Sequence, residues 1–122
     1  MKTLPIIGDY SVTEIKDSKS PNGELVPFDT TIVKFFFNKI AIFPKGLYSS
    51  EDEIMLTHIS DVEIKVSEDS HTIFTVNTTG KTKYSLFVMG RLGDLEKEKI
   101  FLTILDGETE YSGILMNLSK IY

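Results

Sequence analysis

The chain has 122 residues, so we expect one domain over residues 1–122, large enough to bury roughly two-thirds of its unfolded surface. Hydrophobic residues make up 41% and charged residues 25%, an ordinary globular composition that excludes a disordered chain. The net charge is −5 and Arg91 is the one arginine, so a nucleic-acid partner is not expected. The absence of cysteine excludes disulfides, thiolate metal sites and thiol nucleophiles.

The beginning of the chain carries one lysine and a short apolar stretch that ends at Asp9. This stretch is too short for a secretory signal, so the chain as written is expected to be cytoplasmic. If the native protein has a signal peptide that is missing from the sequence as written, the protein is instead expected to be exported. No apolar run approaches the ~20 residues that a membrane helix requires, and no membrane span is expected.

The first predicted strand covers residues 6–15, and a turn-rich segment follows at 17–23. Along the whole chain apolar residues recur at alternate positions, and β-branched and aromatic residues gather in the same windows, which is typical of strands. Residues 32–37 and 40–43 predict a hairpin that turns at Asn38 and Lys39. Its register pairs Phe35 with Ile42, with Val33 on the same apolar face. The opposite face carries Phe36 and Phe43 and is expected to be partly covered.

Residues 51–59 fit either a short helix or the start of a strand, because Ser50 and Glu53 have capping-box spacing. The next hairpin is better defined. A loop over residues 68–70 sets Ile64 opposite Phe74 and Val62 opposite Val76.

The last predicted strands cover residues 84–89, 101–105 and 111–121. Asp106 and Gly107 suit a two-residue hairpin turn, which would pair Leu102 with Tyr111. Either Ile114, Met116 and Leu118 or the interleaved Leu115 would then face inward. These segments predict an all-β antiparallel meander of about eight strands, which buries its edges most economically as a closed up-and-down barrel. A two-sheet sandwich is the alternative.

The opening run Gly8 to Ile15, the meander of hairpins and the closing run Leu118 to Ile121 together resemble small bacterial lipocalin-like (calycin) domains. Lipocalins typically open with Gly-x-Trp, and a basic residue near the last strand packs across the Trp. Gly8 matches this motif, Tyr10 takes the place of the Trp, and Lys120 is the basic residue; the chain has no Trp. The resemblance implies a closed barrel that binds a small hydrophobic molecule.

No set of residues predicts catalysis, a metal site or a cofactor. The two histidines, His58 and His71, are too far apart along one hairpin, roughly 30 Å at the strand rise, to share a metal. His58 and Asp61 lack a nucleophile at an informative spacing, so the protein is expected not to be an enzyme.

Our first functional hypothesis is a non-enzymatic binding protein that holds a small hydrophobic ligand inside the barrel. An eight-stranded barrel either fills with side chains or holds one such ligand. The expected lining residues are inward-facing and apolar: Val33, Phe35, Ile42, Phe74 and Val76.

The alternative is a protein-interaction module, such as an inhibitor or immunity-type protein, with a solid barrel. Its acidic loops, above all Glu51, Asp52 and Glu53, would then dock a basic protein partner. The sequence does not fix the oligomeric state.

Overall fold

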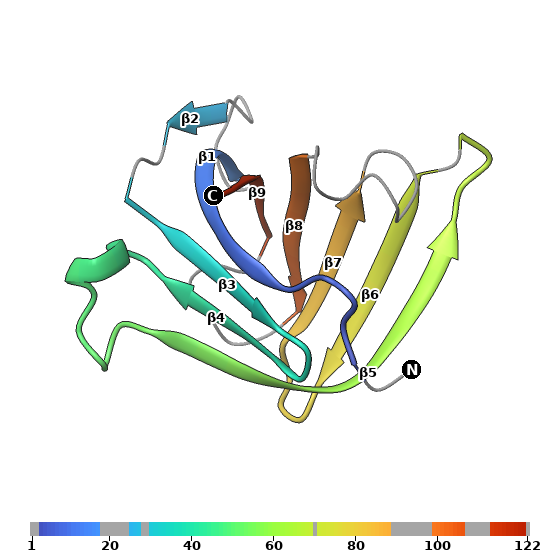
Figure 1. The fold of residues 1–122 in the computed structure, drawn as a ribbon, viewed down its shortest axis with the longest axis horizontal. Helices are drawn as coiled ribbons and strands as arrows, with labels where there is room; N and C mark the ends of the chain where they lie inside the picture. The colour runs from blue at the N-terminus through green and yellow to red at the C-terminus, as the bar shows by residue number, and fades with distance from the viewer. Residues whose placement is uncertain are drawn as a thin grey trace.

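The computed structural model describes residues 3–17, 25–27, 30–69, 71–88, 99–106 and 113–121. These residues form one antiparallel sheet and a single-turn 3₁₀ helix, η1 (Gly46–Tyr48) (Figure 1). The strands are β1 (Gly8–Asp17), β2 (Leu25–Pro27), β3 (Ile32–Phe36), β4 (Lys39–Phe43), β5 (Met55–Val66), β6 (Thr72–Thr78), β7 (Lys83–Val88), β8 (Lys99–Asp106) and β9 (Ile114–Lys120). Within these ranges, no helix is long and apolar enough to span a membrane.

The sheet closes into a barrel because β1 pairs with strands on both of its sides. Its residues 8–11 pair with β3, and its residues 10–17 pair with β9. From β3 to β9 each strand pairs with the next one in the sequence, while β2 adds a short pairing to the far end of β1. The predicted all-β antiparallel meander and its closed barrel are therefore confirmed.

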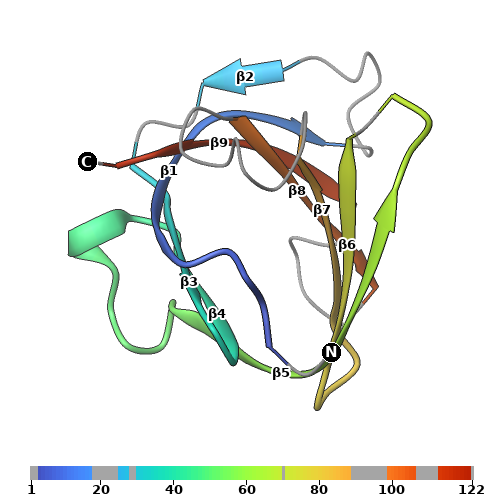
Figure 2. The ribbon, with the colours of Figure 1, turned by 45° about the vertical axis from the view of Figure 1, so that its right-hand side comes forward.

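Two long strands, β1 and β5, bend so that each contributes to two parts of the barrel wall (Figure 2). Both have a register irregularity, between Val12 and Glu14 in β1 and between Ile59 and Asp61 in β5. An extra residue in one strand increases the local twist and turns its direction. Residues 55–58 of β5 pair with β4, and residues 59–66 pair with β6.

The β5–β6 hairpin has the predicted register, with Val62 opposite Val76 and Ile64 opposite Phe74. Residues 51–53 form a turn and not a helix, and the strand begins at Met55. The strand alternative for this segment is thus the correct one.

The predicted register of the β3–β4 hairpin is wrong by two residues. Phe35 lies opposite Ile40 and not Ile42, because the turn is formed by Phe37 and Asn38. Both turn carbonyls accept hydrogen bonds from distant backbone: Leu4 N–H donates to Phe37 O (2.8 Å) and Ile59 N–H donates to Asn38 O (2.8 Å). These tertiary contacts fix the turn. A shift of two residues preserves the faces, so the apolar face itself was predicted correctly.

The predicted register of β8 with β9 is also wrong. Leu102 lies opposite Met116 and not Tyr111, and the Gly113 N–H still donates to Ile104 O at 2.8 Å. With Leu102 opposite Tyr111, the odd-numbered residues of β9 would share the core face with Leu102. Met116 and Leu118 would then be exposed. Burial of these apolar side chains outweighs the preference of Asp-Gly for a tight turn. That turn was predicted at Asp106 and Gly107; Asp106 is the last residue of β8, and residues 107–112 lie outside the described residues.

The core fills the barrel from both the strands and the segment that precedes β1. Leu4 and Ile6 of this segment are buried, and Tyr10 meets Phe35 edge to face, with ring centroids 5.3 Å apart. The buried apolar side chains of the strands form one cluster with them: Val12, Val33, Ile40, Ile42, Ile59, Val62, Phe74, Val76, Tyr84, Leu86, Val88, Ile100, Leu102, Ile104, Met116 and Leu118.

Candidate functional site

The residues predicted to line a ligand cavity all lie in the packed core. The exposed fraction is 1% for Phe35 and 0% for the other four: Val33, Ile42, Phe74 and Val76. A cavity wide enough for a ligand would leave surface on its lining residues that a water-sized sphere could touch. At these positions the barrel interior is filled by side chains.

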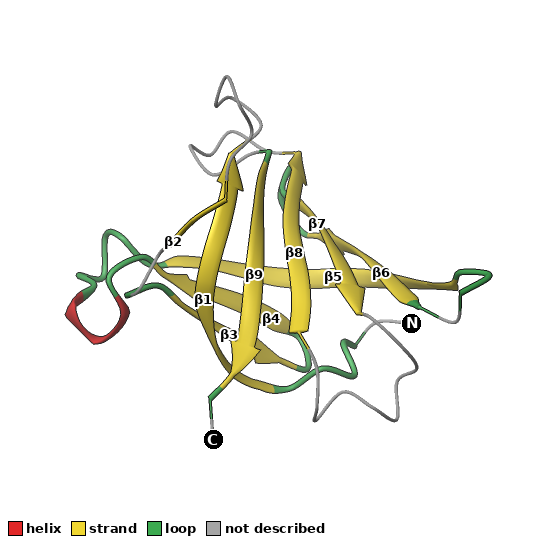
Figure 3. Ribbon diagram, turned by 90° about the horizontal axis from the view of Figure 1, so that it is seen from above, coloured by secondary structure: helices red, strands yellow, loops and turns green. Residues whose placement is uncertain are grey.

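The residues predicted to dock a partner lie elsewhere, in the segment between β4 and β5. We call residues 44–54 the β4–β5 loop. It contains η1 and projects from the side of the barrel (Figure 3). Glu51 and Asp52 are exposed in a turn near its end, and Glu53 is partly buried.

Polar contacts within the β4–β5 loop join its beginning to its end. Lys45 N–H donates to Ser49 Oγ (2.8 Å), and Lys45 Nζ lies 3.2 Å from Glu53 Oε2. Ser50 Oγ donates to Glu53 Oε1 (2.9 Å), so the spacing read as a capping box closes a turn. These contacts lower the pKa of Glu53, through the Ser50 hydroxyl first and Lys45 second. Glu53 is thus a structural residue of the loop.

The loop is anchored to the start of β3. Thr31 Oγ1 donates to Pro44 O at 2.8 Å. Gly46 has φ +56°, and a Cβ at this position would lie 2.5 Å from Thr30 O. Only glycine fits this contact, because an L side chain would meet both the strained φ and the carbonyl.

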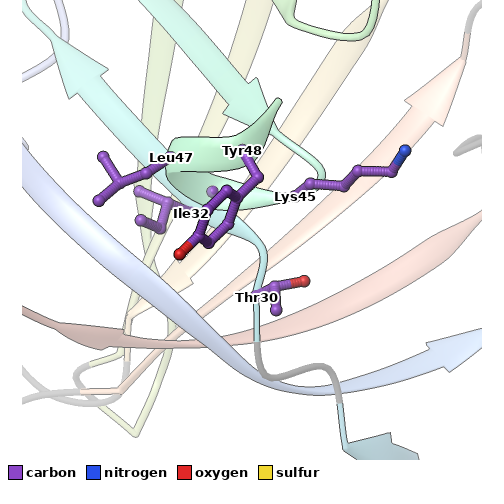
Figure 4. Close-up of a pocket in the computed structure, with 6 residues that line it drawn as sticks. Thr30, Ile32, Lys45, Leu47 and Tyr48 are labelled. Carbon is purple, nitrogen blue, oxygen red and sulfur yellow. The ribbon is translucent and has the colours of Figure 1, made fainter. Parts of the chain in front are cut away.

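Two large apolar side chains next to each other on η1 face solvent. Leu47 is 92% exposed and Tyr48 is 89% exposed. Between η1 and the start of β3 lies a groove of about 160 Å³ (Figure 4), whose lining residues are Thr30, Ile32, Lys45, Gly46, Leu47 and Tyr48. Sequence reasoning missed Leu47 and Tyr48; the available signal was an apolar pair directly after the turn-forming run Pro44 to Gly46, outside any alternating pattern.

The histidines do not form a site. His58 lies exposed opposite Lys39 on β4, while His71 lies in the β5–β6 turn with its ring 5.3 Å from that of Phe87. Among the described residues, no group of three His, Asp or Glu side chains is placed to hold a metal ion.

The residues behind the lipocalin resemblance lie together in the structure. Tyr10 is opposite Lys120 in the β1–β9 pairing. A Cβ on Gly8 would lie 3.6 Å from Lys120 Cε and 3.9 Å from Tyr10 Cε1. Both distances are ordinary van der Waals contacts, so a Cβ would fit in this space, and it is the φ of +136° that favours glycine at position 8.

The aromatic side chains on the outer face of the β3–β4 hairpin are partly covered, as expected, by lysines. Lys39 Nζ lies 4.9 Å from the centre of the Phe36 ring, and Lys34 Nζ lies 5.5 Å from that of Phe43. Because of these cation–π contacts, Phe36 and Phe43 are less exposed than Leu47 and Tyr48 on η1.

No protein-family model matches the chain, and no curated protein matches it in sequence.

Proposed function

We propose that this protein is a non-enzymatic interaction module that docks a protein partner through the β4–β5 loop. The observation that carries the proposal is the near-complete exposure of Leu47 and Tyr48 on a loop held by its own hydrogen bonds. Exposing two large apolar side chains side by side is unfavourable in water unless a partner covers them. A preorganised loop binds with a smaller loss of conformational entropy than a flexible one.

The partner is expected to offer an apolar pocket with basic residues at its rim. Leu47 and Tyr48 would fill the pocket, and tyrosine in particular is common among the residues that dominate binding energy. Glu51 and Asp52, exposed a few residues further on, would face the basic rim. The net charge of −5 favours the approach of such a partner at low salt.

The small-ligand hypothesis has less support from the geometry. A hydrophobic molecule would have to displace side chains that already fill the interior around Phe35 and Phe74. A bound mass of a few hundred daltons in native mass spectrometry would restore that hypothesis.

The docking proposal is tested by quantitative capture from a lysate of the source organism. Replacing both Leu47 and Tyr48 by Ser is expected to weaken capture of the partner at least about tenfold, since each residue would act as a binding hot spot. Phe37→Ser is the matched control, because Phe37 is a large, exposed side chain on a different turn. Glu51→Lys should also weaken capture, most strongly at low salt.

The proposal is wrong if the double variant, still folded by circular dichroism, retains the same proteins as the wild type. It is equally wrong if Phe37→Ser loses them to the same extent, because the loss would then not depend on η1.

A further inference from the structure

The second half of β5 has one unpaired edge. Residues 59–66 pair with β6, whereas the pairing of β5 with β4 ends at His58. On the side away from β6, Ile59 N–H still donates to Asn38 O, and no other strand among the described residues pairs with residues 62–66. Glu63, Ile64, Lys65 and Val66 are all exposed, although a strand with one covered face would bury every second residue. This end of β5 therefore extends past the barrel (Figure 3).

The hydrogen-bond pattern identifies which backbone groups this edge offers. Ser67 N–H donates to His71 O at 2.8 Å, so the pair 67 and 71 is of the hydrogen-bonded kind. These pairs alternate along an antiparallel ladder, and Lys65 and Glu63 therefore also turn their backbone groups toward β6. The N–H and C=O groups of residues 62, 64 and 66 point the other way, to the free edge.

We propose that this edge is a dimerisation surface, on which a second copy of the chain pairs antiparallel with β5 about a two-fold axis at Ile64. In this register Val62 lies opposite the partner's Val66, and Ile64 lies opposite its own copy. Glu63 lies opposite the partner's Lys65, and by symmetry Lys65 lies opposite the partner's Glu63. The edge is thus complementary to itself in charge and in shape.

Other two-fold registers lack this complementarity. Because the free backbone groups belong to even-numbered residues, the register must pair even residues with even residues. An axis at Glu63 would set this carboxylate directly opposite its own copy, and an axis at Lys65 would do the same for the ammonium group. Like charges directly opposed across two strands destabilise the pairing.

The contact also covers apolar surface that the barrel leaves exposed. Ile64 is 38% exposed and Val66 is 62% exposed. In the dimer these side chains lie on one face of a continuous sheet, and the Glu63 and Lys65 pairs lie on the other. An edge contact of this kind is small, so the dimer is expected to dissociate on dilution.

Sedimentation velocity over a wide range of protein concentrations tests the proposal. The wild type is expected to form dimers as the concentration rises, and Glu63→Lys or Lys65→Glu alone should weaken the dimer about tenfold or more, because each opposes like charges twice. The double variant with both substitutions should recover wild-type dimerisation. An equimolar mixture of the two single variants should form a heterodimer, since each chain supplies the charges that the other lacks.

Both charged side chains are exposed, so the single variants are expected to keep the circular dichroism spectrum and thermal midpoint of the wild type. A wild type that stays monomeric at every concentration overturns the proposal. Single variants that dimerise as well as the wild type overturn it too. A mixture or a double variant that stays monomeric rejects the register and with it the proposed axis.

Discussion

A single residue, Gly46, allows the β4–β5 loop to pack against the segment before β3. Its φ of +56° and the 2.5 Å approach of a Cβ to Thr30 O leave no room for a side chain. By residue type alone, Pro44 and Gly46 are turn formers. Position 46 requires glycine because of the Thr30 carbonyl, which lies just before β3 and is distant from the loop in sequence.

Gly46→Ala is expected to lower the free energy of unfolding by about 1–3 kcal/mol, the usual cost of a strained backbone conformation. Gly80→Ala is the matched control, because a Cβ there has nothing within 4 Å and φ is not in the left-handed region. Its effect should stay within about 0.5 kcal/mol. Urea denaturation of the three proteins measures both, and equal effects would remove the role assigned to Gly46.

Individual strands show which features the alternation of apolar residues can predict and which it cannot. In β5 and β6 the alternation predicted the faces, and the loop over residues 68–70 predicted the correct register. In β3 and β4 the alternation predicted the faces correctly and the register wrongly. A displacement of two residues leaves every side chain on its own face, so only contacts from other parts of the chain could decide it.

One side-chain contact joins two strands that are not neighbours. Tyr84 Oη on β7 lies 2.9 Å from Thr57 Oγ1 on β5, and burial raises the pKa of the Tyr84 phenol above 10.0. The folded protein therefore holds this proton more tightly than the unfolded chain does. The resulting stability is complete below about pH 10, the pKa of an unfolded tyrosine, and is lost as the pH rises toward the higher folded pKa.

Tyr84→Phe is expected to cost about 1 kcal/mol of stability near neutral pH, because it removes one hydrogen bond. The stability difference between the wild type and this variant should stay constant up to about pH 10 and shrink above it. Urea denaturation at a series of pH values measures the difference. A constant difference across the alkaline range would contradict the raised pKa.

For the molecule as a whole, the ligand-binding and solid-barrel hypotheses make opposite predictions for Phe35. The ligand hypothesis expects Phe35→Ala to alter ligand retention more than folding. Phe35 is instead 1% exposed and packed edge to face on Tyr10. With a filled interior, the substitution is expected to cost about 3–5 kcal/mol through the cavity that it creates.

Phe36→Ala is the control, because the next side chain along the strand lies on the outer face under Lys39 and should cost much less. Chemical denaturation gives both values, and Phe35→Leu supplies a milder version if the alanine variant does not fold. A small cost for Phe35→Ala together with loss of a bound mass in native mass spectrometry would instead support a ligand-binding barrel.

The two proposed surfaces lie at opposite ends of the barrel. In Figure 3 the β4–β5 loop projects on one side and the β5–β6 hairpin on the other. A dimer formed along β5 would therefore leave both copies of η1 free. Two docking loops on one dimer would raise the apparent affinity for a partner that is itself multivalent.

Local pattern predicted the all-β class, the order of the strands in the meander and the apolar faces of β3 to β6, and it favoured a closed barrel over a two-sheet sandwich. These features follow from local turns and from a side-chain period of two, and both can be read from neighbouring residues. Only the folded structure showed the closure through β1 and β9, the registers of β3 with β4 and of β8 with β9, the burial of Phe35 and Phe74, and the exposure of Leu47 and Tyr48. These depend on contacts between residues far apart in the chain, which a local pattern does not encode.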